Sequence, residues 1–284
     1  MTSLSVLGSG SAGNAFALVS EGMVLLIDAG FSAREIARRA AVAGVDLTRL
    51  SGIALTHEHG DHAQGALRLA EQHDVPVLAS AGTWAALGGR RGVRHLPLRC
   101  TSRTECGPFT LAGCDLQHDA AEPLALTVTT SAGVTVGIAY DFGRATQALR
   151  YHFRSLNAIV LEANYDEVML RTSSYPASVQ HRIAGGGGHL SNTASAQLLL
   201  ELHHPGLTTV VLAHLSRRCN TPDAARAAVE PVLRAAGFAG RLVIATQDSP
   251  LAPFPLTDTL TLPFPAFADD AAATKNGAPE EAPV

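Results

Sequence analysis

The chain has 284 residues, of which 46% are hydrophobic and 16% are charged, and its formal net charge is −4. This length and apolar content can fill a sizeable core. No window approaches the roughly 18 to 20 consecutive apolar residues of a membrane span, and the N-terminus lacks the basic region of a secretory signal. We therefore expect a cytoplasmic protein without a membrane partner.

The cysteines and the charge distribution narrow the class further. Four cysteines follow no paired metal spacing and are too few for a disulfide framework, so we interpret them as reduced thiols. From Leu256 onward there are five acids and one base, Lys275, so residues 1–255 sum to zero. Every other base is arginine, which suits bidentate phosphate contacts but also fits the codon bias of a GC-rich genome.

The first part of the chain predicts three short strands, at 4–7, 15–19 and 23–28, and a helix at 32–43. The loop between the first two strands, residues 8–14, is rich in glycine and serine. Such a loop could bring backbone N–H groups to an anion, or it could be only a tight hairpin. The third strand ends in a carboxylate, Asp28, which we expect to orient a ligand imidazole by accepting its second N–H.

A dense group of metal-ligand side chains follows the apolar run 52–55. His57, His59, Asp61 and His62 lie within six residues. Imidazole nitrogen and carboxylate oxygen hold zinc, manganese or iron, and this spacing offers more ligands than one tetrahedral ion needs. Two adjacent ions are the first hypothesis, and a solvated loop that is histidine-rich by chance is the alternative.

The rest of the chain predicts further strands, several of which end in candidate ligands. Helices are expected at 63–72, 83–87 and 191–202 and from Thr221, and strands at 75–78, 109–111, 115–117, 124–129, 134–139, 158–161 and 208–212, with a final strand at 241–245. His118, Asp141 and His214 each follow a strand-like run closely. Ligands recur at strand ends when a site lies along one edge of packed sheets. Beyond residue 255, proline, alanine and acids dominate, so we expect a folded domain over 1–255 and a disordered tail over 256–284.

The His-x-His-x-Asp-His motif and the later candidates resemble the metallo-β-lactamase superfamily over about residues 3–250. The resemblance implies an α/β fold, a four-layer αββα sandwich with the metal site at one edge of its two sheets. It also implies two divalent ions, zinc or manganese. The implied ligands are His57, His59 and His118 for one ion and Asp61, His62 and His214 for the other, with Asp141 as the bridge.

Further motifs lie outside the histidine loop: Gly8-Ser9-Gly10-Ser11, His118-Asp119-Ala120-Ala121-Glu122-Pro123, Leu161-Glu162-Ala163-Asn164-Tyr165-Asp166, His189-Leu190-Ser191-Asn192, Ala213-His214-Leu215-Ser216 and Asn220-Thr221-Pro222. Together they are similar to the YycJ/WalJ group, which implies a metal-dependent nuclease that acts 5′ to 3′ on DNA. Other members often carry histidine where this chain has Tyr165, and the run at 140–143 departs from their usual Thr-Asp-Thr-Gly. The wall that faces the substrate near Tyr165 and Phe142 is therefore expected to differ.

The chemistry expected of such a site is hydrolysis by metal-bound hydroxide. Coordination lowers the pKa of water from 15.7 toward about 7, and two ions can neutralise charge on the attacked phosphate. Asp61 could position the hydroxide. His189, which follows four glycines, could donate a proton at a pKa near neutrality or hold a phosphate oxygen, although it could also be a plain helix-entry histidine.

Three functions stay open at this point. A DNA exonuclease is favoured by the narrower motifs. A small-molecule hydrolase on the same scaffold, such as a cyclic phosphodiesterase, a glyoxalase II-type thioesterase or a lactonase, would share residues 57–62 without requiring the motif at His189. A metal-stabilised regulatory protein with no turnover is disfavoured by the complete ligand set.

Overall fold

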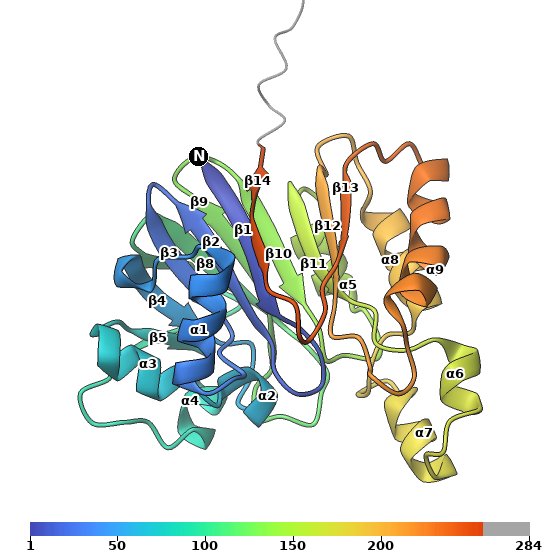
Figure 1. Ribbon diagram of the computed structural model, residues 1–284, viewed down its shortest axis with the longest axis horizontal. Helices are drawn as coiled ribbons and strands as arrows, with labels where there is room; N and C mark the ends of the chain where they lie inside the picture. The colour runs from blue at the N-terminus through green and yellow to red at the C-terminus, as the bar shows by residue number, and fades with distance from the viewer. Residues whose placement is uncertain (258–284) are drawn as a thin grey trace, which may run out of the picture.

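The computed structural model describes residues 1–257, which form two seven-stranded sheets packed face to face between helices (Figure 1). The first sheet has the order β14-β1-β2-β3-β4-β5-β6 and the second the order β13-β12-β11-β10-β9-β8-β7. The strands of the first sheet are β1 (Thr2–Gly8), β2 (Ala15–Ser20), β3 (Met23–Ile27), β4 (Leu50–Ala54), β5 (Val77–Ala79), β6 (His95–Pro97) and β14 (Leu251–Leu256). Those of the second are β7 (Thr104–Cys106), β8 (Phe109–Asp115), β9 (Leu124–Thr130), β10 (Thr135–Ala139), β11 (Ala158–Glu162), β12 (Thr209–Ala213) and β13 (Arg241–Ile244).

Helices cover the outer face of each sheet. On the side of the first sheet the chain forms α1 (Ala33–Ala43), the short 3-10 helix η1 (Leu47–Arg49), α2 (Gly60–Ala63), α3 (Ala66–His73) and α4 (Ala81–Ala86). The second half of the chain forms α5 (Gln147–Phe153), α6 (Glu167–Arg171), α7 (Ala177–Ile183), α8 (Asn192–Leu202) and α9 (Pro222–Ala235). The predicted αββα sandwich is thereby confirmed.

The apolar runs of the sequence explain the layers. Side chains alternate between the two faces of a strand, so a strand that is buried on both faces has a continuous apolar run. In β3, Leu25 and Ile27 join the core between the sheets, whereas Val24 and Leu26 join the core beneath α1 and α3. A third core lies between the second sheet and helices α5, α8 and α9.

The sheet topology places the candidate residues at one edge. Strands β3 to β6 run parallel to one another, and so do β10 to β13. Parallel strands end at the same edge of a sheet. Three residues that directly follow or lie just past strand ends, Asp28, Asp141 and His214, adopt left-handed backbone conformations with φ of 55°, 59° and 54°. Such conformations are uncommon outside glycine and concentrate at functional sites.

Several elements differ from those expected. Strands β6, β7 and β14 and helices α5, α6 and α7 were not predicted. The strand expected at 115–117 is wrong, because β8 is one continuous strand that ends at Asp115. The strand at 241–244 is not the last one: β14 follows it and pairs antiparallel with β1, with Phe254 opposite Leu4.

The boundary expected after residue 255 falls at the last residue of β14, since Leu256 pairs with Thr2. The remainder of the expected tail, residues 258–284, lies outside the described residues. Within residues 1–257, no helix is long and apolar enough to cross a membrane.

Residues 166–188, which we call the α6–α7 arm, project beyond the strand ends (Figure 1). The arm has a small apolar cluster of its own, in which Leu170 packs with Tyr165 and Cys219, and Tyr175 and Ile183 pack against them. Helix α7 buries none of its residues fully. The arm therefore lies beside the edge at which the candidate residues gather rather than in the sandwich.

Candidate metal centre

The structure brings all the residues predicted as ligands into one cluster. His57, His59 and His118 offer ligand atoms within 4.8 Å of one another, as do Asp61, His62 and His214. A further group, His57, His62 and Asp141, joins the two. The candidate ligands therefore form two adjacent halves with Asp141 in reach of both, and a further group joins Asp141 to Glu162, His189 and His214.

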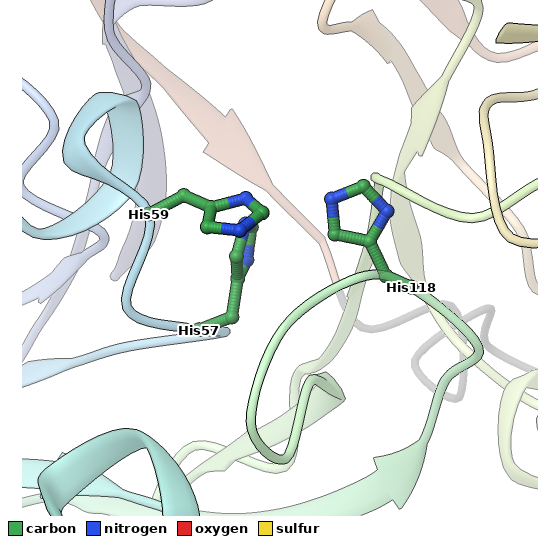
Figure 2. Close-up of side chains that lie close together, drawn as sticks. All are labelled: His57, His59 and His118. Carbon is green, nitrogen blue, oxygen red and sulfur yellow. The ribbon is translucent and has the colours of Figure 1, made fainter. Parts of the chain in front are cut away.

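The first half consists of three imidazoles from two loops. Figure 2 shows His57 and His59, from the loop after β4, and His118, from the loop between β8 and β9, with their rings turned toward one another. His59 Nε2 donates to the carbonyl of Asp119 at 3.2 Å, and His118 Nδ1 donates to the carbonyl of Gly187 at 3.1 Å. These contacts leave His59 Nδ1 and His118 Nε2 as the remaining ring nitrogens, and histidine binds metal through such a nitrogen. His118 Nε2 also lies 3.1 Å from Asp119 Oδ1.

The second half is deeper and contains a carboxylate. Asp61 Oδ2 lies 3.4 Å from His62 Nε2 and 3.5 Å from His214 Nε2. Ligands that each lie about 2.1 Å from one tetrahedral ion are separated by about 3.4 Å. The two distances from Asp61 therefore fit ligands of a single small divalent cation.

Asp141 faces both halves. Its Oδ2 atom lies 3.5 Å from His57 Nε2 and 2.8 Å from His62 Nε2, and the side chain is buried. Burial alone would raise the pKa of Asp141, but the charges of His214 and His62 outweigh it and hold that pKa well below its ordinary value. The carboxylate is therefore ionised between the two halves.

Unpaired buried nitrogens indicate that the cluster fits a cation. Among residues 1–257, His57 Nε2 and His214 Nε2 are buried without a hydrogen-bond partner. Leaving a buried polar atom unpaired costs about 1–3 kcal/mol, and folded proteins rarely tolerate it. Burial, followed by the charge of His62, also lowers the pKa of His57 well below its usual value, which keeps its lone pair available. These donors match a divalent metal.

Asp28 holds His62 as the sequence predicts. Its Oδ2 atom accepts hydrogen bonds from His62 Nδ1 at 2.7 Å, from Tyr140 Oη at 2.6 Å and from Thr56 Oγ1 at 2.9 Å. Its Oδ1 atom accepts the backbone N–H of Thr56 at 2.8 Å. The carboxylate fixes the tautomer of His62, so that Nε2 faces Asp61 and Asp141.

Glu162 has a matching role that the sequence analysis missed. This fully buried residue ends β11, and its Oε1 atom accepts hydrogen bonds from His189 Nδ1 at 2.7 Å and from His214 Nδ1 at 3.0 Å. Its Oε2 atom accepts the backbone N–H of Leu190 at 3.1 Å and that of Phe142 at 3.3 Å. An acid at the end of a buried strand, as at Asp28, was the available signal.

His189 lies in the same cluster, beside two carboxylates. Its Nδ1 atom lies 3.2 Å from Asp141 Oδ1 as well as 2.7 Å from Glu162 Oε1. Burial alone would lower the pKa of His189, but the charges of Glu162 and Asp141 raise it to about 9. The two carboxylates therefore favour the protonated imidazole when no metal is bound.

The glycine-rich loop braces the cluster, and most of its N–H groups are paired within the protein. The N–H groups of Ser9, Gly10, Ala12 and Gly13 all bond within the protein. Ser9 Oγ accepts the N–H of His214 at 2.8 Å, and Asn14 Nδ2 lies 3.2 Å from His62 Nε2. Most of the loop is therefore a structural turn that braces the cluster, and Ser11 is the residue of it that lines the cavity.

The side chains of Tyr165 and Phe142 do not form part of the wall of the site. Both side chains are buried, Tyr165 in the cluster under the arm and Phe142 in the core beneath α5 and α8. Neither lines the cavity at the ligands. Any difference that they make to the substrate-facing wall does not come from direct contact of these two side chains with the cavity.

The cluster opens into a cavity of about 240 Å³. A wider hollow of about 690 Å³ adjoins it and shares its wall at His118, Asp119 and Arg182. The two also share Gly187 and Gly188, which belong to the run of four glycines at 185–188 that we call the glycine turn. The cavity is lined by Ser11, His59, Asp61, His118, Asp119, Asp141, Arg182, Ile183, Gly187, Gly188, His189 and His214. A substrate can therefore reach the ligands through the cavity and extend beyond them into the wider hollow.

Comparison with known proteins agrees with this geometry. Residues 24–215 match the profile of the beta-lactamase superfamily domain, and the chain belongs to that superfamily. It is a metal-dependent hydrolase that binds divalent metal.

Two curated relatives and one solved structure define its neighbourhood. The chain is 32% identical to exodeoxyribonuclease YycJ of Bacillus anthracis over 238 residues, which cover 82% of this chain and 90% of the relative. It is 28% identical to exodeoxyribonuclease WalJ of Streptococcus pneumoniae over 228 residues, which cover 78% and 84%. The metallo-beta-lactamase fold protein YhfI from Bacillus subtilis superposes with a TM-score of 0.66 at 18% identity, over 88% of this chain and 99% of that one, which supports the fold.

Replacing Glu162 by glutamine should weaken metal affinity by about 10- to 100-fold. The carboxylate accepts hydrogen bonds from His189, His214 and two backbone N–H groups, and an amide has only one oxygen with which to replace them. Competition with a chromogenic chelator measures the change. Glu201→Gln, which removes only the surface partner of Arg150, is the control; equal affinities for the two variants would exclude this role of Glu162.

Proposed function

We propose that the protein is a dinuclear-metal phosphodiesterase that removes nucleotides from DNA in the 5′ to 3′ direction. The observation that carries the proposal is the pair of ligand groups joined by Asp141, with His189 in the same cavity. Two-ion centres suit the displacement of phosphate esters. The exodeoxyribonuclease names of relatives that match over most of both chains support DNA as the substrate.

We assign the ligands as two sets around a shared carboxylate. His57, His59 and His118 would hold one ion, Asp61, His62 and His214 would hold the second, and Asp141 would bridge them. Zinc and manganese both suit imidazole and carboxylate donors. When bound, such ions supply Lewis acidity, which makes water more acidic and neutralises charge on the phosphate.

In this proposal Asp61 also orients the attacking water molecule. Its side chain is 27% exposed and lines the cavity, whereas Asp141, which also lines the cavity, is buried. Burial alone would raise the pKa of Asp61, but the nearby imidazoles of His214 and His62 keep it well below its usual range. The ionised carboxylate can therefore accept a hydrogen bond from a water molecule and orient it toward phosphorus.

His189 acts on the leaving oxygen in this proposal. With Nδ1 held by Glu162, the opposite ring nitrogen remains for the substrate, and the ring lines the cavity. A protonated imidazole can donate its proton to the departing alkoxide or hold a phosphate oxygen. Cations nearby would lower its raised pKa, which favours the transfer of the proton.

The test supplies purified protein with manganese or zinc and follows DNA that is labelled at either end. Release of mononucleotide from the 5′-labelled end before the 3′-labelled end is expected. His59→Ala should abolish it, whereas His73→Ala, at a histidine that lines neither hollow, should not. Rapid turnover of a cyclic phosphodiester or a thioester without cleavage of DNA would overturn the proposal.

A further inference from the structure

We propose that Arg182 forms a second phosphate subsite beside the metal centre, so that the protein engages two consecutive phosphates of one strand. This inference rests on the proposed function, because it needs a substrate with more than one phosphate. The metal ligands would act on the phosphate to be cleaved, and Arg182 would hold its neighbour.

Arg182 has the position that such a subsite needs. It lines both the cavity at the ligands and the wider hollow beside it, and it is the one arginine that does so within residues 1–257. Its side chain is exposed and has no hydrogen-bond, ion-pair or ring partner among those residues. By contrast, Arg217, which follows His214 closely, is paired with Asp248 at 2.6 Å. A free, planar guanidinium matches a phosphate diester.

The backbone holds Arg182 at a fixed place relative to the catalytic groups. The carbonyl of the next residue, Ile183, accepts the N–H of His189 at 2.8 Å. In the glycine turn, the carbonyl of Gly186 accepts the N–H of Gly143 at 3.2 Å, and that of Gly187 accepts His118 Nδ1 at 3.1 Å. Hydrogen bonds to His189, Gly143 and His118 therefore fix the end of α7 and the glycine turn against the cavity.

Gly188 allows this close approach. A Cβ atom there would lie 2.2 Å from the carbonyl oxygen of Arg182 and 2.3 Å from that of Ile183. Because both contacts are with backbone, no side-chain movement could relieve them. The absence of a side chain at Gly188 thus allows the end of α7 to lie close to His189, and this places Arg182 beside the cavity.

One carboxylate in the cavity competes with a phosphate for Arg182. Asp119 lines both hollows, and its Oδ1 atom lies 3.1 Å from His118 Nε2. It is directed at the imidazole, and no ion pair joins it to Arg182. The guanidinium therefore stays available for an anion that enters along the wider hollow.

The experiment compares substrates with one and with several phosphates on the metal-loaded enzyme. Arg182→Ala should lower kcat/KM on a DNA oligonucleotide about tenfold, mainly through KM, because it removes one charged hydrogen-bonding partner. Hydrolysis of bis(p-nitrophenyl) phosphate should stay within about twofold, because this substrate has one phosphate and leaves Arg182 no neighbouring phosphate to hold. The slope of log KM against log salt concentration should fall by about 0.7, the share of one phosphate on a single strand.

Matched variants separate this role from a structural one. Arg171→Ala removes an exposed arginine from the same arm that lines neither hollow, and it should match the wild type. Arg182→Lys keeps the charge and should recover part of the affinity. Equal losses on both substrates, or no loss on the oligonucleotide, would refute the subsite while leaving the proposed function intact. A wild type that cleaves no oligonucleotide would overturn both.

Discussion

Asp141→Asn should lower kcat for DNA hydrolysis by at least about a thousandfold, because a neutral amide cannot bridge two cations. Asp141 Oδ2 lies between the two ligand groups, 3.5 Å from His57 Nε2 and 2.8 Å from His62 Nε2. Asparagine has nearly the same volume and tolerates the left-handed conformation of this residue, with φ of 59°. The fold should therefore persist, and steady-state kinetics at saturating metal measure the loss.

The control for this variant is Asp248→Asn. Asp248 is exposed and pairs only with Arg217 among the described residues, so its replacement should leave kcat unchanged. A melting temperature close to that of the wild type would show that Asp141→Asn is folded. Retention of a tenth or more of the wild-type kcat by Asp141→Asn would rule out the bridging role.

His189→Ala should lower kcat on DNA by about 10²- to 10⁴-fold, the usual contribution of a general acid. The leaving group of DNA is an alkoxide, which needs a proton, whereas p-nitrophenolate leaves without one. The same variant should therefore lose far less activity on bis(p-nitrophenyl) phosphate. Comparison of kcat on the two substrates measures the proton transfer itself.

His181→Ala is the matched control for His189. His181 lies on α7, is exposed and lines neither hollow, so both substrates should be turned over at the wild-type rate. If His189→Ala loses activity equally on DNA and on bis(p-nitrophenyl) phosphate, the imidazole positions the site and does not donate a proton. This pattern also differs from that of Arg182→Ala, whose effect lies in KM and in the salt dependence.

The residues that sequence alone could place were those with distinctive chemistry at strand ends. His57, His59 and His62 stand out because histidine is rare and closely spaced there, and Asp141 and His214 follow apolar strands of the second sheet. Glu162, by contrast, has no histidine or other candidate ligand close to it in the sequence. A single acid after an apolar strand is compatible with a cap or a surface residue, and only the fold brings it against His189 and His214.

The missed elements have local physical causes. Strand β14 contains Pro253 and Pro255, which argue against a strand, but an edge strand tolerates proline because one side of its backbone is unpaired. Helix α7 buries no residue fully and so has no amphipathic pattern to detect. The role inferred for Arg182 depends on this helix and could not be read from the sequence.

The most direct test of the account is the number of divalent ions that the protein holds, counted by native mass spectrometry. The wild type should retain two ions per chain when it is purified with manganese or zinc, and Asp141→Asn should retain fewer. These results would match two ligand sets joined by one carboxylate. A wild type that holds a single ion at saturating metal, or an Asp141→Asn variant that still holds two, would contradict the dinuclear centre.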